Sequence, residues 1–141
     1  MDHCPFCAIG AGEVDADLVA SRTPHTYAIP ALRQWPANPG HMLVLPTGHA
    51  ASLWDMGDGL RTELFGHVAR IAAVLAAAFD AAGTTVIQNN DTPGQTLHHL
   101  HVHVVPRSPR DGFVMAAATV REVPRGERAG QAAALRAALQ A

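Results

Sequence analysis

Lysine is absent from this chain of 141 residues, and all ten of its basic residues are arginine. A Walker-type phosphate loop and a Schiff-base enzyme each need a lysine, so both classes are excluded. Charged residues make up only 16% and apolar residues 48%, a balance typical of a packed globular protein. The net charge of -2 gives no electrostatic reason to expect a long nucleic acid as a partner.

Cysteine is also scarce, and the two that are present, Cys4 and Cys7, are separated by two residues. That spacing suits one metal ion or a redox pair better than a disulfide framework. No apolar run reaches the roughly 20 residues of a membrane span, and the N-terminus lacks the features of a signal peptide. We therefore expect a cytoplasmic protein without a membrane partner, and the length predicts a single domain over residues 1–141.

Periodicity and turn signals predict a mixed architecture. Strands are expected at residues 17–21, 26–30, 41–46, 84–88 and 97–105, the last ended by Pro106. Between Leu60 and Ala82, apolar residues recur every three or four positions, which predicts one long helix with Asp58 as N-cap and Gly83 as C-cap. A short helix is expected at 127–140. Because strands and helices do not alternate regularly, we expect an α+β fold with an antiparallel sheet and one main helix.

Histidine is abundant: the chain has nine, of which four fall within six positions, namely His98, His99, His101 and His103. Side chains alternate between the faces of a strand, so His99, His101 and His103 share one face. A rise of about 3.3 Å per residue spaces them by roughly 6.6 Å, so one small anionic ligand can touch all three. Core packing does not explain the row, because three buried imidazoles are costly to desolvate.

Two kinds of chemistry remain open for this row of histidines. A His-x-His pair on a strand can chelate zinc, with a third ligand elsewhere and one position left for water. Alternatively, one neutral imidazole attacks phosphorus while its neighbours stabilise the developing charge. The residues around the row decide between these two.

The stretch GQTLHHLHVHVV at residues 94–105 resembles the signature of the histidine triad family, His-φ-His-φ-His-φ-φ with φ apolar, preceded by Gly-Gln-Ser/Thr. Upstream, PGHMLVLP at residues 39–46 is similar to the family's Pro-Gly-His-x-Leu-Val-x-Pro strand, and the region of Asp55 and Met56 is a third match. The resemblance covers residues 4–113, followed by a tail and a helix over 114–141.

This resemblance implies a fold and a mechanism. The fold is an antiparallel sheet of about five strands with one long helix, usually paired as a homodimer. His101, the middle histidine of the triad, becomes the nucleophile that attacks the α-phosphorus of a nucleotide and forms a nucleotidyl-imidazole that water hydrolyses. His103 lies near the phosphate and leaving group, and His41 orients the triad. The phosphate contacts implied by the motif are Gln88, Gln95 and Thr96.

The same resemblance implies a structural zinc ion. Bacterial members of the family often hold zinc with a Cys-x-x-Cys pair, the histidine after the Leu-Val-x-Pro strand and the first triad histidine. The corresponding residues are Cys4, Cys7, His49 and His99. Four ligands close a tetrahedral site and leave no position for water, which is typical of a structural rather than a catalytic zinc. His98 falls on the opposite face of the strand.

Other matches concern the branch of the family. Arg33 stands where a ribose-contacting Asp or Asn is usual, and Trp35 offers a stacking surface instead. The VPR and DGF segments at 105–107 and 111–113 are closer to the fragile-histidine-triad branch, whose members cleave dinucleoside polyphosphates. Arg107 is then expected to contact the extra phosphates, because a guanidinium pairs bidentately with phosphoryl oxygens.

Three alternatives share these residues. A nucleoside phosphoramidase uses the same triad with another leaving group. A nucleotide-binding regulatory module keeps the site and turns over negligibly. A zinc metalloenzyme uses the His-x-His pair directly and loses activity to chelators.

Overall fold

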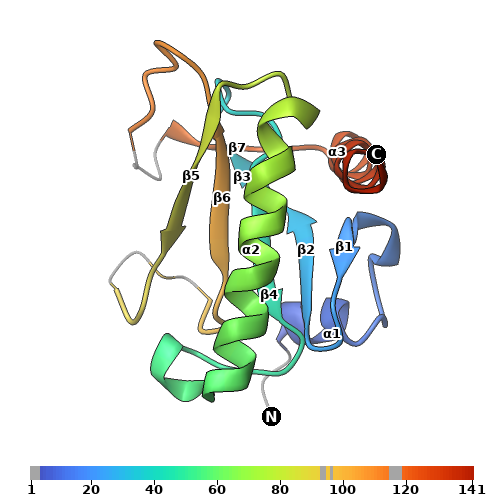
Figure 1. Cartoon of the computed structure of the whole chain (residues 1–141), viewed down its shortest axis with the longest axis vertical. Coiled ribbons are helices and arrows are strands. Elements are labelled where there is room, and N and C mark those ends of the chain that lie inside the picture. Colours follow the sequence, from blue (N-terminus) through green and yellow to red (C-terminus); the bar gives the residue numbers. More distant parts are fainter. Residues whose placement is uncertain (1–3, 93–94, 96, 115–118) are drawn as a thin grey trace.

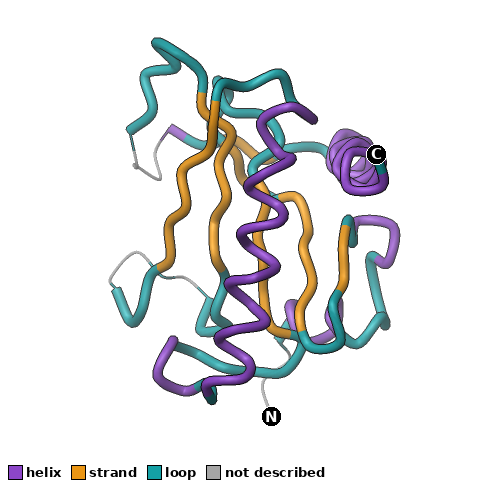
Figure 2. Tube along the Cα trace, in the orientation of Figure 1, coloured by secondary structure: helices purple, strands orange, loops and turns teal. Residues whose placement is uncertain are grey.

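The structure is a computed structural model that describes residues 4–92, 95, 97–114 and 119–141. Its main sheet is antiparallel and has the strand order β1-β2-β4-β6-β5 (Figures 1 and 2). The strands are β1 (Ser21–Arg22), β2 (Thr26–Pro30), β4 (Met42–Pro46), β6 (Val102–Arg107) and β5 (Gly83–Gln88). A second sheet pairs β3 (Arg33–Gln34) with β7 (Arg121–Glu122). The helices are α1 (Pro5–Gly10), α2 (Asp58–Ala78) and α3 (Arg125–Gln140), with 3-10 turns at Ala16–Leu18 and Leu53–Asp55.

The long helix α2 crosses one face of the five-stranded sheet (Figure 1). Its buried residues recur every three or four positions, and they pack with the alternate residues of β4 and β6 that face the helix. The members of this core include Leu64, Val68, Ile71, Leu75, Val44, Val102 and Val104. The expected α+β fold with about five antiparallel strands and one main helix is therefore confirmed.

A second apolar cluster covers the opposite face of the sheet. It contains Tyr27 and Ile29 of β2, Leu43 and Leu45 of β4, and Ile9 of α1, with Phe6 packed against it. The central strands β2 and β4 are buried along their whole length because they are covered on both faces. His103 pairs with Leu43 in the sheet register, so the face opposite α2 is the one that carries the histidine row.

The end of α2 differs from the prediction, because Gly83 is the first residue of β5 and not a C-cap. The left-handed position after the helix belongs to Asp80, whose φ is 53°. The amide of Ala81 donates to the carbonyl of Ala76 (2.7 Å) and the amide of Asp80 to that of Ala77 (3.4 Å). This pair of bonds is the Schellman arrangement, here closed by aspartate where glycine is usual.

Other boundaries also shift. The segment expected as a strand at 17–21 is a 3-10 turn up to Leu18, and β1 begins only at Ser21. The strand expected at 97–105 is β6, which begins at Val102 because the amide of Leu100 donates to Ala50 (2.6 Å) and takes no place in the ladder. Helix α2 begins at Asp58 itself, and α3 begins at Arg125. The elements α1, β3 and β7 were not predicted.

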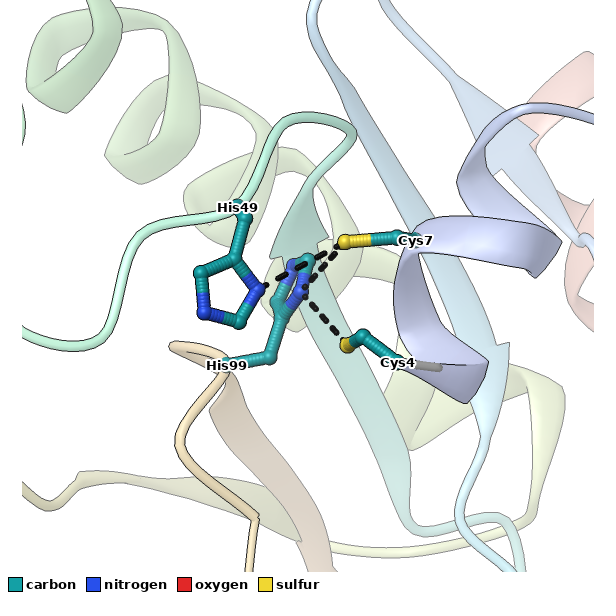
Figure 3. Close-up of side chains that lie close together, drawn as sticks. All are labelled: Cys4, Cys7, His49 and His99. Carbon is teal, nitrogen blue, oxygen red and sulfur yellow. Dashed lines mark hydrogen bonds between the residues drawn. The ribbon is translucent and has the colours of Figure 1, made fainter. Parts of the chain in front are cut away.

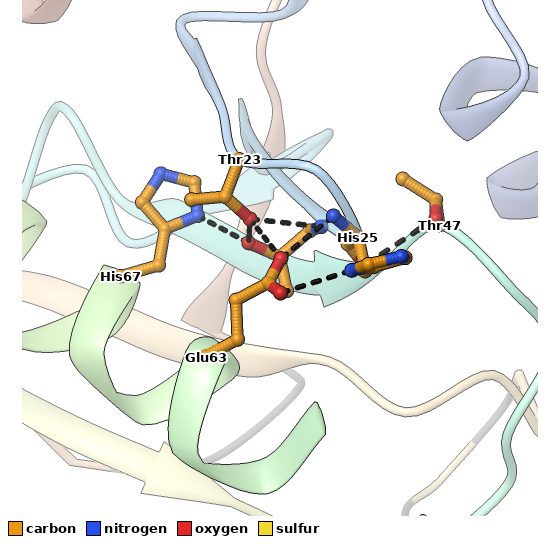
Figure 4. A network of polar contacts seen from close by, with 6 residues as sticks. Thr23, His25, Thr47, Glu63 and His67 are labelled. Atoms are coloured by element: carbon orange, nitrogen blue, oxygen red, sulfur yellow. Dashed lines mark hydrogen bonds and ion pairs between the residues drawn. The ribbon is translucent and has the colours of Figure 1, made fainter. Parts of the chain in front are cut away.

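A polar network ties α2 to the loop before β2 (Figure 4). The ring of His67, on α2 and 1% exposed, lies 2.8 Å from Ser21 Oγ through Nε2 and 2.7 Å from Thr26 Oγ1 through Nδ1. Thr26 in turn contacts Thr23, whose hydroxyl donates to the carboxylate of Glu63. Burial lowers the pKa of His67 to about 4. This histidine is a neutral structural residue with both ring nitrogens paired.

Gly40, which precedes His41, yields a prediction for the fold. Its φ is 95°, and a Cβ built there would lie 2.5 Å from the ring of Phe79. We expect Gly40→Ala to reduce the free energy of unfolding by roughly 2–4 kcal/mol, from left-handed backbone strain plus overpacking. Urea unfolding measures the change. The control is Gly66→Ala on α2, where a Cβ meets nothing within 4 Å and alanine should stabilise by about 0.5–1 kcal/mol. Equal effects of the two changes would contradict the account of Gly40.

Candidate active site and metal-binding cluster

Two histidines of the triad lie side by side on the face opposite α2. The ring centroids of His101 and His103 are 4.9 Å apart, in an edge-to-face arrangement. Only His103 belongs to β6, since His101 directly precedes the strand. Leu100 and Val102 point into the core under α2, so alternation of side chains holds across the start of the strand.

The ring of His101 has a defined orientation. Its Nδ1 lies 2.8 Å from the backbone carbonyl of His99, and a carbonyl can only accept, so Nδ1 carries the proton and donates. The other nitrogen, Nε2, then keeps its lone pair. Burial lowers the pKa of His101, which favours the neutral ring. The residue therefore presents a bare imidazole nitrogen, the form that a nucleophile requires.

The ring of His41, 2% exposed, holds His103, the third histidine of the row. Its Nε2 lies 2.9 Å from Nδ1 of His103. Burial, followed by the neighbouring imidazoles, lowers the pKa of His41 to about 3, and burial lowers that of His103 to about 4. Nδ1 of His41 is buried without a partner among the described residues, and an unpaired N–H is the costlier orphan. Nε2–H of His41 therefore donates to His103, which leaves His103 with its own proton on Nε2.

A second cluster lies at the end of the histidine row (Figure 3). One ligand atom from each of four residues, Cys4, Cys7, His49 and His99, falls within 4.8 Å of all the others. These are the four residues that the motif resemblance implied for zinc. His98, by contrast, is exposed and makes no part of the cluster.

The geometry of the cluster fits a tetrahedral zinc ion. Nitrogen and sulfur ligands at about 2.0 and 2.3 Å from such an ion lie roughly 3.5 Å from each other. Nδ1 of His99 lies 3.4 Å from Sγ of Cys4 and 3.5 Å from Sγ of Cys7, and Nδ1 of His49 lies 3.6 Å from Sγ of Cys7. Nε2 of His99 donates to the carbonyl of Pro46 (2.9 Å), which leaves Nδ1 as a bare ligand atom.

Phe6 connects the cluster with the triad, and the sequence analysis missed it. Its ring centroid lies 5.7 Å from that of His99 and 5.7 Å from that of His101. The hydroxyl of Tyr27 donates to the carbonyl of Phe6 (2.6 Å) and so fixes α1 on the sheet. A large apolar residue between the two cysteines was the available signal, since it predicts a packed rather than a solvated loop.

Trp35 and Phe113 close the other end of the row. The indole of Trp35 stacks on the ring of His41 at 5.3 Å, with 25° between the planes, and meets Phe113 edge-on at 4.8 Å. One face of the Trp35 ring is therefore occupied by a histidine of the site, while the side chain is only partly buried. Arg33, at the position where the family usually has a ribose contact, is exposed on β3.

The residues expected to contact phosphate lie in and after β5. The amide of Gln88 makes reciprocal bonds with that of Asn90 (2.7 and 3.0 Å), and Gln95 accepts from the amide of Asp91 (2.8 Å). Thr96 lies outside the described residues. Gln88 is thus held by its own loop, and Gln95 also donates to the carbonyl of Ala51 (3.5 Å) in the segment before α2.

Arg107 is largely occupied by neighbouring residues. Its Nε and Nη2 donate to Asp111 (2.7 and 3.2 Å), and its Nη1 donates to Thr85 (3.0 Å). The guanidinium carbon also lies 4.5 Å from the ring centroid of Phe113. These bonds use three of the five N–H groups of the side chain. Arg107 therefore has a structural role, and two of its N–H groups take no part in these three bonds.

The sheet, the helix across it and the row of three histidines define a histidine triad domain. A family model described as HIT domain matches residues 12–110, and the chain belongs to this family. No helix in the described part of the chain combines the length and the apolar character of a membrane span.

Three relatives illustrate the range of the family. The protein hit of Bacillus subtilis is 32% identical over 114 residues, 79% of this chain and 77% of its own. The crystal structure of a Zn-bound histidine triad family protein from Mycobacterium smegmatis has a TM-score of 0.81 and 30% identity, covering 97% and 93% of the two chains. The asymmetrical bis(5'-nucleosyl)-tetraphosphatase of Schizosaccharomyces pombe is 36% identical over 77 residues, 54% of this chain but only 42% of its own.

The site predicts a pH dependence of stability. The Arg107 guanidinium beside Asp111 holds the pKa of that carboxyl well below its usual range, with help from the amides of Ser108 and Phe113 and from Asn38. A depressed pKa stabilises the fold above the unfolded value, about pH 4, and this contribution is lost as the pH falls further. We expect Asp111→Asn to be less stable than wild type by a constant amount at pH 5–8.

The gap between the two proteins should narrow as the pH falls below about 4. Chemical unfolding measured at several pH values tests this expectation. Glu13→Gln, which removes an exposed carboxylate outside this network, is the control. A gap that stays constant down to pH 2 would show that the charge of Asp111 is not the source of its contribution.

Proposed function

We propose that this protein is a hydrolase or nucleotidyl transferase that attacks the α-phosphorus of a nucleotide through His101, acting on dinucleoside polyphosphates. The observation that carries the proposal is the tautomer of His101, whose Nδ1–H is held by the carbonyl of His99. This bond aims an unprotonated Nε2 away from the backbone. His103 stands beside it with an N–H available to an oxygen of the reacting phosphate.

The reaction proceeds in two displacements. In the first, Nε2 of His101 forms a bond to the α-phosphorus, the bond from phosphorus to the bridging oxygen breaks, and its electron pair leaves with the departing phosphate chain. In the second, water attacks the same phosphorus, the P–N bond breaks, and its electron pair returns to Nε2. The proton released by water passes to the product phosphate or to solvent. The N–H of His103 stabilises the negative oxygens in both steps.

The substrate class rests on the relatives and on the segment after the triad. A tetraphosphatase of dinucleosides is among the similar proteins, with less than half of its length covered. Gln88, Gln95 and Thr96 are proposed as contacts to the α-phosphate, and the two remaining N–H groups of Arg107 as contacts to the longer phosphate chain. Arg107 donates to the carboxylate of Asp111 and is so held at the end of β6, near Trp35 and Phe113.

We further propose that Cys4, Cys7, His49 and His99 hold one structural zinc ion. The spacing of their ligand atoms and the lone pair on Nδ1 of His99 support this assignment, and the similar mycobacterial protein is described as Zn-bound. When bound, the ion would cross-link α1 to the turn after β4 and to the start of the triad. Four protein ligands leave no position for water, so the ion takes no direct part in the reaction.

We also propose that residues 1–141 act as one domain that forms a homodimer in the cytoplasm. Strand β5 supports the dimer, since it lies at an edge of the described main sheet and Val86 on it is 46% exposed. Two free thiols suit a reducing compartment. The molar mass in solution, measured by light scattering, tests the dimer.

The central test replaces the nucleophile. His101→Ala should reduce kcat for diadenosine tetraphosphate by at least a thousandfold, because the covalent step is lost, while nucleotide affinity and the melting temperature change little. Its control is His98→Ala, which removes an exposed histidine three residues away. Mass analysis of quenched wild-type enzyme should find the nucleotidyl adduct on His101. Turnover that survives in His101→Ala, or an adduct on another histidine, would overturn the mechanism.

The zinc assignment is tested separately. Wild-type protein purified without chelators should contain about one zinc per chain under this four-ligand scheme. Cys4→Ala should lose it, with a fall in melting temperature of at least about 5 °C, because metal binding contributes to folding free energy. A chelator should lower the melting temperature of the wild type to that of the variant and leave the variant unchanged. Protein without metal, and equal melting temperatures, would remove zinc from the proposal.

A further inference from the structure

Gln34 is a buried hub that the proposed reaction does not use. Its side chain is 1% exposed, and its amide donates two hydrogen bonds and accepts two. Its Nε2 donates to the carbonyl of Ala31 (2.9 Å) and to Oε1 of Gln131 (2.7 Å), and its Oε1 accepts from the amide of Gly40 and from Nε2 of Gln131 (both 3.1 Å). Two of these bonds span the loop from β2 to β4, and the other two reach α3. A buried amide with all its hydrogen bonds made restricts the movement of the segments that it connects, here the loop and α3.

The loop spanned by Gln34, residues 31–41, ends at His41. The amide of Ala31 donates to the carbonyl of His41 (2.9 Å), so the loop is closed at its base by the backbone and inside by Gln34. Gly40, whose amide Gln34 binds, sits at a φ of 95° directly before His41. The backbone on both sides of His41 is therefore fixed by this loop. The imidazole ring of His41 makes the hydrogen bond to His103.

The C-terminal segment, residues 121–131, contacts the 31–41 loop at three points. Strand β7 pairs with β3, which contains Gln34. The amide of Val123 donates to the carbonyl of Leu32 (2.8 Å). Gln131, 7% exposed, reaches Gln34 from α3, which itself packs against α2 and β2. Segments about a hundred residues apart in sequence are thus joined next to the histidine row.

We infer that Gln131 of α3 is a positioning residue for the triad, acting through Gln34 and the 31–41 loop to hold His41 against His103. The inference rests on the proposed function, since it concerns the tautomer that the reaction needs. If the loop loosens, His41 no longer enforces a bare Nδ1 on His103, and part of the population carries the proton there. That fraction presents no N–H to the phosphate.

The test uses Gln131→Met in the full-length protein, a change that keeps the side-chain volume and removes the amide. The matched control is Gln140→Met, the same change at an exposed position of the same helix. Two quantities are measured: kcat and KM for diadenosine tetraphosphate, and the tautomer of His103 from long-range proton–nitrogen correlations of its ring. The second measurement needs no turnover.

Gln131→Met should lower kcat about tenfold with KM within about twofold, since a displaced catalytic group affects the transition state more than binding. His103 should change from the Nε2–H form to a mixture. Gln140→Met should match wild type in both. If Gln131→Met lowers only the melting temperature, with kcat and the His103 tautomer as in the control, the amide is merely structural and the inference is wrong. Should the methionine variant not fold, Gln131→Asn, which keeps an amide too short to reach Gln34, must give the same tautomer mixture.

The proposed function and this inference fail separately. Wild-type protein that hydrolyses neither diadenosine tetraphosphate nor an adenosine phosphoramidate would refute the function, while the tautomer of His103 in Gln131→Met would still decide the inference. Conversely, an active wild type with an unchanged tautomer in Gln131→Met would refute the inference alone.

Discussion

The arrangement of the site depends on His99, a residue that is completely buried. Its Nδ1 belongs to the cysteine cluster, its Nε2 donates to the end of β4, and its carbonyl accepts from His101. One residue therefore links three parts of the molecule: the N-terminal segment with Cys4 and Cys7, the end of strand β4 and the nucleophile His101. Both ring nitrogens of His99 have partners, so a displacement of the cluster would also shift the carbonyl that orients His101, two residues further along the chain.

Burial determines the protonation state of the row, because it lowers the pKa of His41, His101 and His103. A buried imidazole prefers the neutral form, so three neighbouring histidines avoid the repulsion of like charges. Each neutral ring has one donor and one acceptor, and a chain of hydrogen bonds then fixes which nitrogen carries the proton. The backbone carbonyl of His99 sets this choice for His101. Nδ1 of His41, which has no partner among the residues that the structure describes, sets it for His103. The residues that alternate with these histidines, Leu100, Val102 and Val104, are buried in the core under α2 and so hold this segment on the sheet.

Features that repeat with a period were predictable from the sequence. The row His99, His101 and His103, the long helix and the strand at Thr26–Pro30 all follow from alternation or from helical spacing, and the four cluster residues follow from a motif. Features that depend on one distant contact were not predictable. The late start of β6 depends on Leu100 binding Ala50, and the end of α2 depends on Asp80 adopting the left-handed conformation that glycine usually takes. Neither contact leaves a local pattern.

The pair of hydrogen bonds between Gln34 and Gln131 is another distant contact that the sequence did not predict. Neither glutamine carries a local sequence signal of burial, and the two meet because β3 pairs with β7 and α3 packs against β2. The termini of the chain consequently brace the histidine row from its two ends, α1 through the cluster at His99 and α3 through Gln34 at His41. The hydrogen bonds that orient the histidines are therefore supported from both sides. The order of the site therefore comes from the segments outside the central strands as much as from the strands themselves.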